Sequence, residues 1–129
     1  MSEFRDAVEA RDSERLEALL ADDVVFRSPA VHPPYEGRTA TSVVLRAVMR
    51  VFEDFRYTRT LENGADHVLV FEARVGDRQI EGADFLHVDE HGLIDDFRVM
   101  IRPLSGLTAV VEAMAAAIPE VMRELGLEP

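Results

Sequence analysis

The chain has 129 residues, of which 47% are hydrophobic and 30% charged, and its formal net charge at pH 7 is −11. This length predicts one domain over residues 1–129, and the negative charge disfavours nucleic acid and anionic membranes as partners. Because the chain has no cysteine, disulfides, zinc–thiolate sites and thiol nucleophiles are excluded. The charged N-terminal segment and the lack of an apolar run near ~20 residues predict a cytoplasmic protein that does not span a membrane.

The first half of the chain predicts three helices, one strand and a loop. In chain order they are two short helices within 3–20, a strand over 24–28, an irregular loop over 29–37 and a helix over 38–52. Asp12 and Ser13 can cap the second helix, and the pair at 22–23 is expected to end the helical region. Thr39 or Thr41 can cap the third helix.

The second half of the chain predicts four antiparallel strands joined by turns. In chain order the strands lie within 55–61, 67–75, 78–88 and 93–102. Gly76-Asp77 predicts a two-residue hairpin loop, which would place Leu69 and Phe71 on the same face as Asp84. A three-residue loop would invert that register, because side chains alternate between the two faces. Asn63-Gly64 and the turn ending at Gly92 predict the other two connections.

After Pro103 the spacing of apolar residues predicts a C-terminal helix. Its expected buried stripe consists of Leu107, Val111, Met114, Ile118, Val121 and Leu125. Pro119 lies inside this stripe and predicts a kink or a break.

Asp84 is the sharpest chemical feature of the sequence. It shares one face of its predicted strand with the apolar or small residues Ile80, Gly82, Leu86 and Val88. Burial of an ionised carboxylate costs several kcal/mol, so such a group must be paired, become protonated, or face a cavity.

The predicted elements make an α+β fold. A curved antiparallel sheet wraps around the N-terminal helices as a cone, and the C-terminal helix lies at the mouth of the cone. A cone of this kind can hold a small apolar molecule.

The order of elements resembles the nuclear transport factor 2-like superfamily, with Ala21-Asp22-Asp23 before the first strand and Gly92-Leu-Ile-Asp-Asp-Phe-Arg-Val99 in the last hairpin. That superfamily includes ketosteroid isomerases, SnoaL-like polyketide cyclases, limonene-epoxide hydrolases and many binding or association domains. The resemblance implies a single SnoaL-like domain with the ketosteroid isomerase-like fold. It does not imply one activity, because the fold hosts unrelated functions.

The ketosteroid isomerases use a general-base aspartate and an oxyanion hole made of a tyrosine and a protonated aspartate. By the resemblance, Asp84 matches the oxyanion aspartate, since both lie eight residues before the glycine of the last hairpin. Phe4 stands at the tyrosine position and Ser28 at the position of the base. Phenylalanine has no proton to donate, and an unassisted serine hydroxyl cannot remove a proton from carbon, so that mechanism is disfavoured.

This sequence also lacks some of the catalytic residues of two other families in that superfamily. The SnoaL-like cyclases carry a histidine and an aspartate on the last strand, where this sequence has Phe97-Arg98-Val99. The epoxide hydrolases hold a water in an Asp-Arg-Asp network, of which Arg74 and Asp84 supply a part, and Asp95 is the candidate for the second carboxylate. No complete catalytic set is found, and the sequence leaves open whether the protein is an enzyme.

The candidate ligand-binding residues are aromatic and aliphatic side chains expected to face the cone, with a few polar ones. They are Phe26, Ser28, His32, Tyr35, Phe52, Phe55, Tyr57, Phe71, Asp84, Leu86, Phe97, Val99 and Ile101. Asp84 is also the candidate catalytic residue, as a neutral hydrogen-bond donor or a general base. The alternative is a structural carboxylate satisfied by Tyr57, Ser28, an arginine or water. The four dispersed histidines show no metal-ligand spacing, so we expect no metal and no cofactor.

Three functions follow as alternatives. The favoured one is a small-molecule-binding domain whose apolar ligand is oriented by Asp84. The second is an enzyme of the isomerase, cyclase or hydrolase kind that uses Asp84 with Ser28, Tyr57 or His32. The third is a non-catalytic dimerisation module with a filled core, and an open cavity of about a few hundred Å³ would distinguish the first two from it.

The outer face of the predicted sheet mixes apolar and charged side chains. It is expected to carry Glu81, Phe85, His87, Arg98, Met100 and Arg102. Such a mixture can be self-complementary about a twofold axis, so we expect a homodimer through this face.

Overall fold

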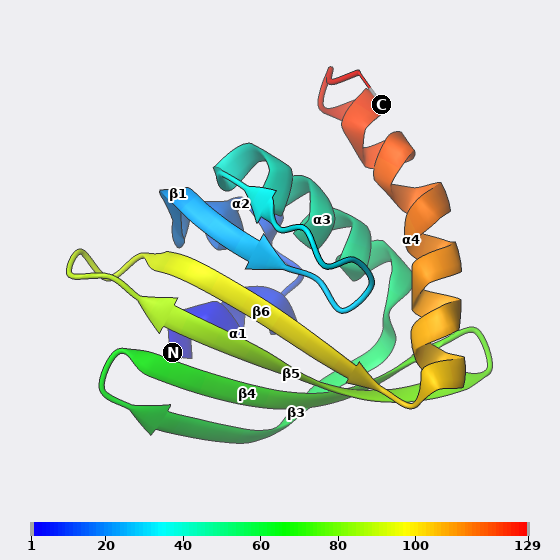
Figure 1. Cartoon of the computed structure of the whole chain (residues 1–129), viewed down its shortest axis with the longest axis horizontal. Helices are drawn as coiled ribbons and strands as arrows, with labels where there is room; N and C mark the ends of the chain where they lie inside the picture. The colour runs from blue at the N-terminus through cyan, green and yellow to red at the C-terminus, as the bar shows by residue number, and fades with distance from the viewer. Residues whose placement is uncertain (1, 129) are drawn as a thin grey trace.

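The computed structural model describes residues 2–128, which form an α+β fold with one curved sheet (Figure 1). The elements are α1 (Ser2–Glu9), α2 (Ser13–Ala18), β1 (Leu20–Arg27), β2 (Tyr35–Glu36), α3 (Arg38–Val51), β3 (Glu53–Asn63), β4 (Asp66–Val75), β5 (Arg78–Val88), β6 (Ile94–Arg102) and α4 (Leu104–Glu124). Helices α1 to α3 lie on the concave face of the sheet, and α4 crosses one end of it. The predicted α+β class and the order of its elements are therefore confirmed.

The sheet has the strand order β2-β1-β6-β5-β4-β3. Strands β3 to β6 form the expected antiparallel meander, but β1 pairs with β6 in parallel. The expectation of a wholly antiparallel sheet is wrong at this pair. After β1 and β2 the chain crosses the concave face as α3 and enters the far edge of the sheet as β3. The meander from β3 then brings β6 beside β1, and the two strands run in the same direction.

The β4–β5 hairpin has the predicted two-residue loop. Val75 pairs with Arg78, and Gly76 adopts a φ of +61°, a conformation that glycine takes without steric cost. This register places Leu69 opposite Asp84, and on the other side Asp84 lies opposite Val99. The side chain of Asp84 therefore points to the concave face, together with the apolar rows of β4 and β6.

Two details of the N-terminal half differ from the prediction. Asp12 caps α2, as expected, by accepting a hydrogen bond from the amide of Arg15. The residues at 22–23 do not end the helices, because they lie inside β1, where both are exposed next to an irregularity in the pairing with β6. Their carboxylates reach water, so the strand tolerates them.

Helix α3 also begins differently, since its N-cap is Gly37 and no side chain caps it. Thr39 and Thr41 lie within the helix rather than at the cap, and Thr41 is buried. The predicted loop over 29–37 is irregular except for β2, whose two residues pair with Val25 and Phe26.

Helix α4 continues through Pro119 without a break. Its buried residues are Gly106, Val110, Ala117 and Val121. Of the six residues of the predicted stripe only Val121 is buried, so the buried face of α4 is rotated about the helix axis from the predicted one. A Cβ atom at Gly106 would lie 2.4 Å from a methyl carbon of Ile80, so glycine is needed there for α4 to approach β5.

Among the described helices, α4 is the one whose length and mean hydropathy of 1.4 would allow it to cross a membrane. This differs from the expectation that no apolar segment approaches that length. Length and composition alone are weak evidence for a span, and α4 packs against α3, β4, β5 and β6.

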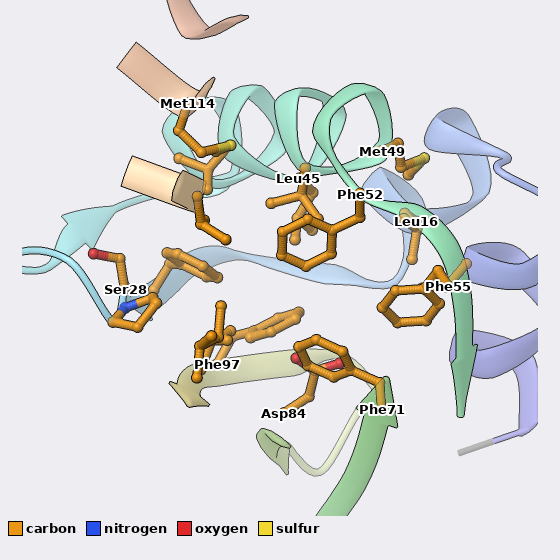
Figure 2. Close-up of a pocket in the computed structure, with 18 of the residues that line it drawn as sticks. Leu16, Ser28, Leu45, Met49, Phe52, Phe55, Phe71, Asp84, Phe97 and Met114 are labelled. Atoms are coloured by element: carbon orange, nitrogen blue, oxygen red, sulfur yellow. The ribbon is translucent and has the colours of Figure 1, made fainter. Parts of the chain in front are cut away.

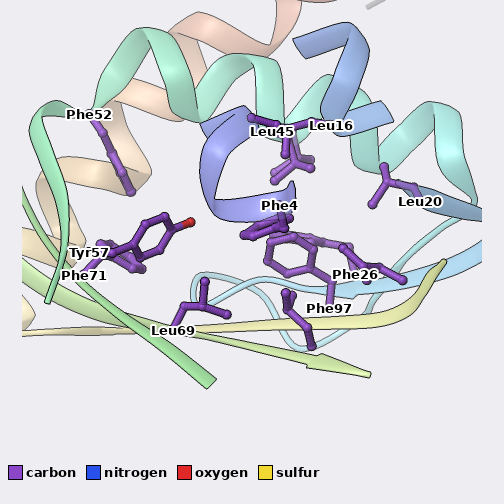
Figure 3. Packing of buried hydrophobic residues seen from close by; sticks show 14 of the residues in the cluster. Phe4, Leu16, Leu20, Phe26, Leu45, Phe52, Tyr57, Leu69, Phe71 and Phe97 are labelled. Atoms are coloured by element: carbon purple, nitrogen blue, oxygen red, sulfur yellow. The ribbon is translucent and has the colours of Figure 1, made fainter. Parts of the chain in front are cut away.

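The core lies between the concave face of the sheet and helices α1 to α3 (Figure 3). At its closed end the ring of Phe97 is 5.6 Å from that of Phe4 and 5.1 Å from that of Phe26, centroid to centroid. Burial of these large rings supplies a major part of the hydrophobic stabilisation. This packing fixes the inner wall against which the cavity lies.

Candidate functional site

A cavity of about 130 Å³ lies between the sheet, α1 to α3 and α4 (Figure 2). Eleven of the thirteen candidate ligand-binding residues line it, namely Phe26, Ser28, Tyr35, Phe52, Phe55, Tyr57, Phe71, Asp84, Phe97, Val99 and Ile101. The volume is below the roughly 300–1,000 Å³ of pockets for drug-sized ligands. It is close to the ~150 Å³ of an engineered apolar cavity that binds benzene.

Two candidate residues do not line the cavity. His32 is exposed in the loop after β1, where the prolines direct the chain over the surface. Leu86 does face the interior, but it is only 2% exposed and packs in the filled part of the core opposite Phe97. The structure therefore does not place these two residues with the other candidates at the cavity.

Most of the helical residues that line the cavity are not among the candidates from the sequence. The additional lining residues are Phe4, Val8, Arg11, Leu16, Pro29, Ala30, Val44, Leu45, Val48, Met49, Val110, Val111, Met114 and Ile118. The apolar periodicity of α3 and α4 contained a signal, because it showed which side of each helix is buried. It could not show that part of each apolar side faces an open space rather than another side chain.

Asp84 is the one carboxylate among the described residues that line the cavity. It is 6% exposed, and the hydroxyl of Tyr57 donates a hydrogen bond to its Oδ2 atom over 3.2 Å. Burial raises the pKa of Asp84 to about 7, and the hydrogen bond from Tyr57 offsets part of that rise. Burial, and then the negative charge of Asp84, raise the pKa of Tyr57 far above its usual range, so Tyr57 remains a neutral donor.

Four aromatic rings line the same cavity as Asp84 and pack against one another. The ring of Phe55 lies 5.0 Å from that of Phe71 and 4.9 Å from that of Tyr57, and the ring of Phe52 lies 5.9 Å from that of Phe71. Phe71 can occupy its place because the residue beside it on β5 is Gly82. A Cβ atom at Gly82 would lie only 2.3 Å from the Phe71 ring.

Two further polar side chains reach the cavity wall. The Oγ atom of Ser28 accepts hydrogen bonds from the amides of Ala30 and Val31 over 3.3 and 3.2 Å, so its own proton is available to a ligand. Arg11 donates to the carbonyl oxygens of Met49 and Phe52 at the end of α3. These contacts hold the loop after β1 and join the turn between α1 and α2 to the end of α3.

The structure does not assemble the Asp-Arg-Asp network considered from the sequence. Arg74 forms ion pairs with Glu53 and Asp54 at the start of β3, away from the cavity. The Oδ1 atom of Asp95 accepts a 2.6 Å hydrogen bond from Nδ1 of His87 on the outer face. No group of three or more His, Asp or Glu side chains within residues 2–128 is placed to hold a metal ion.

Comparison with known proteins gives both a family and a fold. The sequence model of the SnoaL-like domain family matches residues 1–97. A crystal structure of a steroid delta-isomerase from Pseudomonas aeruginosa is 43% identical, covers 95% of this chain and 90% of its own, and superimposes with a TM-score of 0.90. No match was found among curated proteins.

Two other solved structures extend this comparison. A bacterial protein with a cystatin-like fold from Silicibacter pomeroyi DSS-3 is 36% identical over 89% of this chain and 82% of its own, with a TM-score of 0.86. An NTF2-like protein from Mesorhizobium loti is 18% identical over 80% of this chain and 88% of its own, with a TM-score of 0.70, and so supports the fold alone.

Proposed function

The chain belongs to the SnoaL-like domain family, within the nuclear transport factor 2-like superfamily, and from this we propose that it binds a small, largely apolar molecule in the cavity. The observation that carries the proposal is a carboxylate, Asp84, buried in an otherwise apolar cavity wall. An open apolar space with one converging polar group is the usual form of a small-molecule site. In this proposal Asp84 orients the ligand and the aromatic rings supply contact area.

The size of the cavity limits the ligand. A volume of about 130 Å³ suits a single ring with short substituents, and a larger molecule would have to extend past Val111 and Met114 of α4. The steroid delta-isomerase from Pseudomonas aeruginosa makes flat cyclic ketones the first compounds to test. Single-ring ketones and phenols are therefore the core of the panel.

The test is native mass spectrometry of freshly purified protein, run beside thermal shifts with that panel. We expect a retained small molecule, or a rise in melting temperature that Asp84→Ala abolishes. Asp77→Ala is the matched control, because it removes one carboxylate whose side chain is 99% exposed. No ligand and no shift would instead support a non-catalytic dimerisation module.

A second candidate function is an isomerase that uses Asp84 as its acid and base. The pKa of Asp84, about 7, favours this function, because an appreciable fraction of the carboxyl groups is ionised at neutral pH. The similarity to the steroid delta-isomerase also favours it. Asp84 would remove a proton beside the carbonyl of a β,γ-unsaturated ketone and return it at the γ carbon. Formation of the conjugated ketone, followed by its ultraviolet absorbance in the same samples, distinguishes this function from binding.

We also propose that the protein pairs with a second copy through the outer face of the sheet. Phe85 and Met100 are 36% and 53% exposed there, and Arg102 lies 3.4 Å from Glu81 across the same face. Apolar side chains between opposite charges can be self-complementary about a twofold axis.

Arg98→Glu is expected to convert such a dimer to monomer, because it places two added negative charges near the axis of a protein whose net charge is already −11. Analytical ultracentrifugation over a range of concentrations measures the change. Arg15→Glu on α2 changes the charge equally, away from the sheet, and should leave the association unchanged. An Arg98→Glu protein that still sediments as a dimer would exclude this face.

A further inference from the structure

We propose that the polar group of the ligand is a protonated amine attached to an apolar ring, held by Asp84 and the neighbouring aromatic rings. The inference rests on the proposed function, because it requires that the cavity binds a ligand. It adds the charge and the chemical class of that ligand.

Asp84 has no counter-charge among the described residues that line the cavity, apart from the engaged Arg11. Its recorded partner is the neutral hydroxyl of Tyr57, which bonds one carboxylate oxygen, and the second oxygen has no hydrogen-bond partner among residues 2–128. An ionised carboxylate removed from water is strongly destabilised unless a cation and further hydrogen bonds compensate it. An ammonium N–H donating to the second oxygen would supply both.

The charged groups near this pair do not fill that role. Arg5 of α1 lies over the Tyr57 ring, with its guanidinium carbon 5.8 Å from the ring centre, and Glu9 of the same helix acts on Tyr57 with the opposite sign. Arg11, the one cationic side chain among the described residues that line the cavity, is turned to the carbonyl oxygens at the end of α3. The strands on either side of Asp84 present Leu69 and Val99, which carry no charge.

The cavity wall around Asp84 is aromatic. The rings of Phe52, Phe55, Tyr57 and Phe71 form one continuous cluster that lines the same cavity as Asp84. Figure 2 shows Asp84 and Phe71 extending from the sheet toward Phe52 and α3. Aromatic rings attract organic cations within about 6 Å of their centres, and a carboxylate next to such rings selects an ammonium over a neutral apolar group.

The hydroxyl proton of Tyr57 is already engaged by Asp84. Because Tyr57 donates to Asp84, Asp84 itself offers a carbonyl ligand a donor only while it is protonated. An amine needs an acceptor, and Asp84 presents one whenever it is ionised. The surface also favours a cation, since the net charge of −11 raises the local concentration of positive ligands.

The test compares N,N-dimethylcyclohexylamine with cyclohexyl methyl ketone, which have the same ring and closely similar shape. Binding of each to the full chain is measured by isothermal titration at pH 6 and pH 8, in salt sufficient to screen the surface. The amine remains protonated throughout, since aliphatic amines titrate near pH 10, as the lysine side chain does at ~10.4. Its affinity should therefore follow the ionised fraction of Asp84.

We expect the amine to bind at least about tenfold more tightly than the ketone at pH 8, and about tenfold more weakly at pH 6 than at pH 8. Asp84→Asn should abolish most of the amine affinity and leave that of the ketone within about threefold, because the amide can still donate to a carbonyl. Asp77→Asn, which removes an exposed carboxylate, should change neither.

Three results would overturn the inference, and they are distinguishable. Tight binding of the ketone without the amine refutes the cationic ligand and leaves the proposed function intact. Amine binding that survives in Asp84→Asn, or that shows no pH dependence in the wild-type protein, refutes Asp84 as its partner. Binding of neither compound, together with no thermal shift across the panel, refutes the proposed function itself.

Discussion

Asp84→Asn is expected to remove a loss of stability that the wild-type protein undergoes between pH 4 and pH 7. The folded pKa of Asp84 is raised to about 7, whereas an unfolded aspartate titrates near ~3.9. The folded state therefore binds the proton more tightly, and its stabilising contribution is fully present below about pH 4. As pH rises through 7 this contribution is lost, which amounts to up to about 4 kcal/mol of unfolding free energy.

Asparagine is neutral at every pH, so the variant should lack this slope and equal or exceed the wild-type stability at pH 8. Urea denaturation at pH 4.5, 6, 7 and 8 measures the difference between the two proteins. Carboxylates with lowered pKa values, such as Asp89 and Glu124, contribute the opposite slope, but they are common to both and cancel in the difference. Asp77→Asn controls for the change in net charge.

The contrary outcome also has a clear meaning. If Asp84→Asn lost about 2–4 kcal/mol at all pH values, Asp84 would be an ionised structural group whose partner is left uncompensated by the substitution. The interpretation of the cavity as a ligand site would then lose its central observation. A flat difference in the stabilising direction would instead show that folding does not raise the pKa of Asp84, because a raised pKa makes the difference depend on pH.

The position of Asp84 could be predicted from the sequence because local rules determine it. The two-residue loop at Gly76-Asp77 fixes the β4–β5 register, and alternation along β5 then carries Asp84 to the concave face. The two helices before β1 and the long helix after Pro103 follow in the same way from apolar periodicity.

What could not be predicted depends on contacts between distant segments. No local signal states that β1 runs parallel to β6, because that pairing depends on the path of the chain between them. The sequence left several partners open for Asp84, and the choice of Tyr57 depends on the β3–β4–β5 registers together. Which face of α4 is buried depends on the close approach of the helix to Ile80 of β5, which Gly106 allows.

Phe71→Ala is expected to cost about 3–5 kcal/mol of unfolding free energy and to enlarge the cavity. The Phe71 ring is 1% exposed and packs between Phe52 and Phe55, so its removal leaves a void that the neighbouring strands cannot close. The residue beneath the ring is Gly82, which has no side chain to fill the space. The new space is continuous with the existing cavity, so a two-ring ketone should bind the variant more tightly than it binds the wild type.

Chemical denaturation measures the first effect, and isothermal titration with a two-ring and a one-ring ketone measures the second. Phe85→Ala is the matched control, because the same substitution on the outer face, where the ring is 36% exposed, should cost less than about 1 kcal/mol. Measurement at several protein concentrations distinguishes a loss of folding stability from a loss of association. A destabilised Phe71→Ala protein with unchanged preference for ligand size would show that the ring supports the core without bounding the binding site.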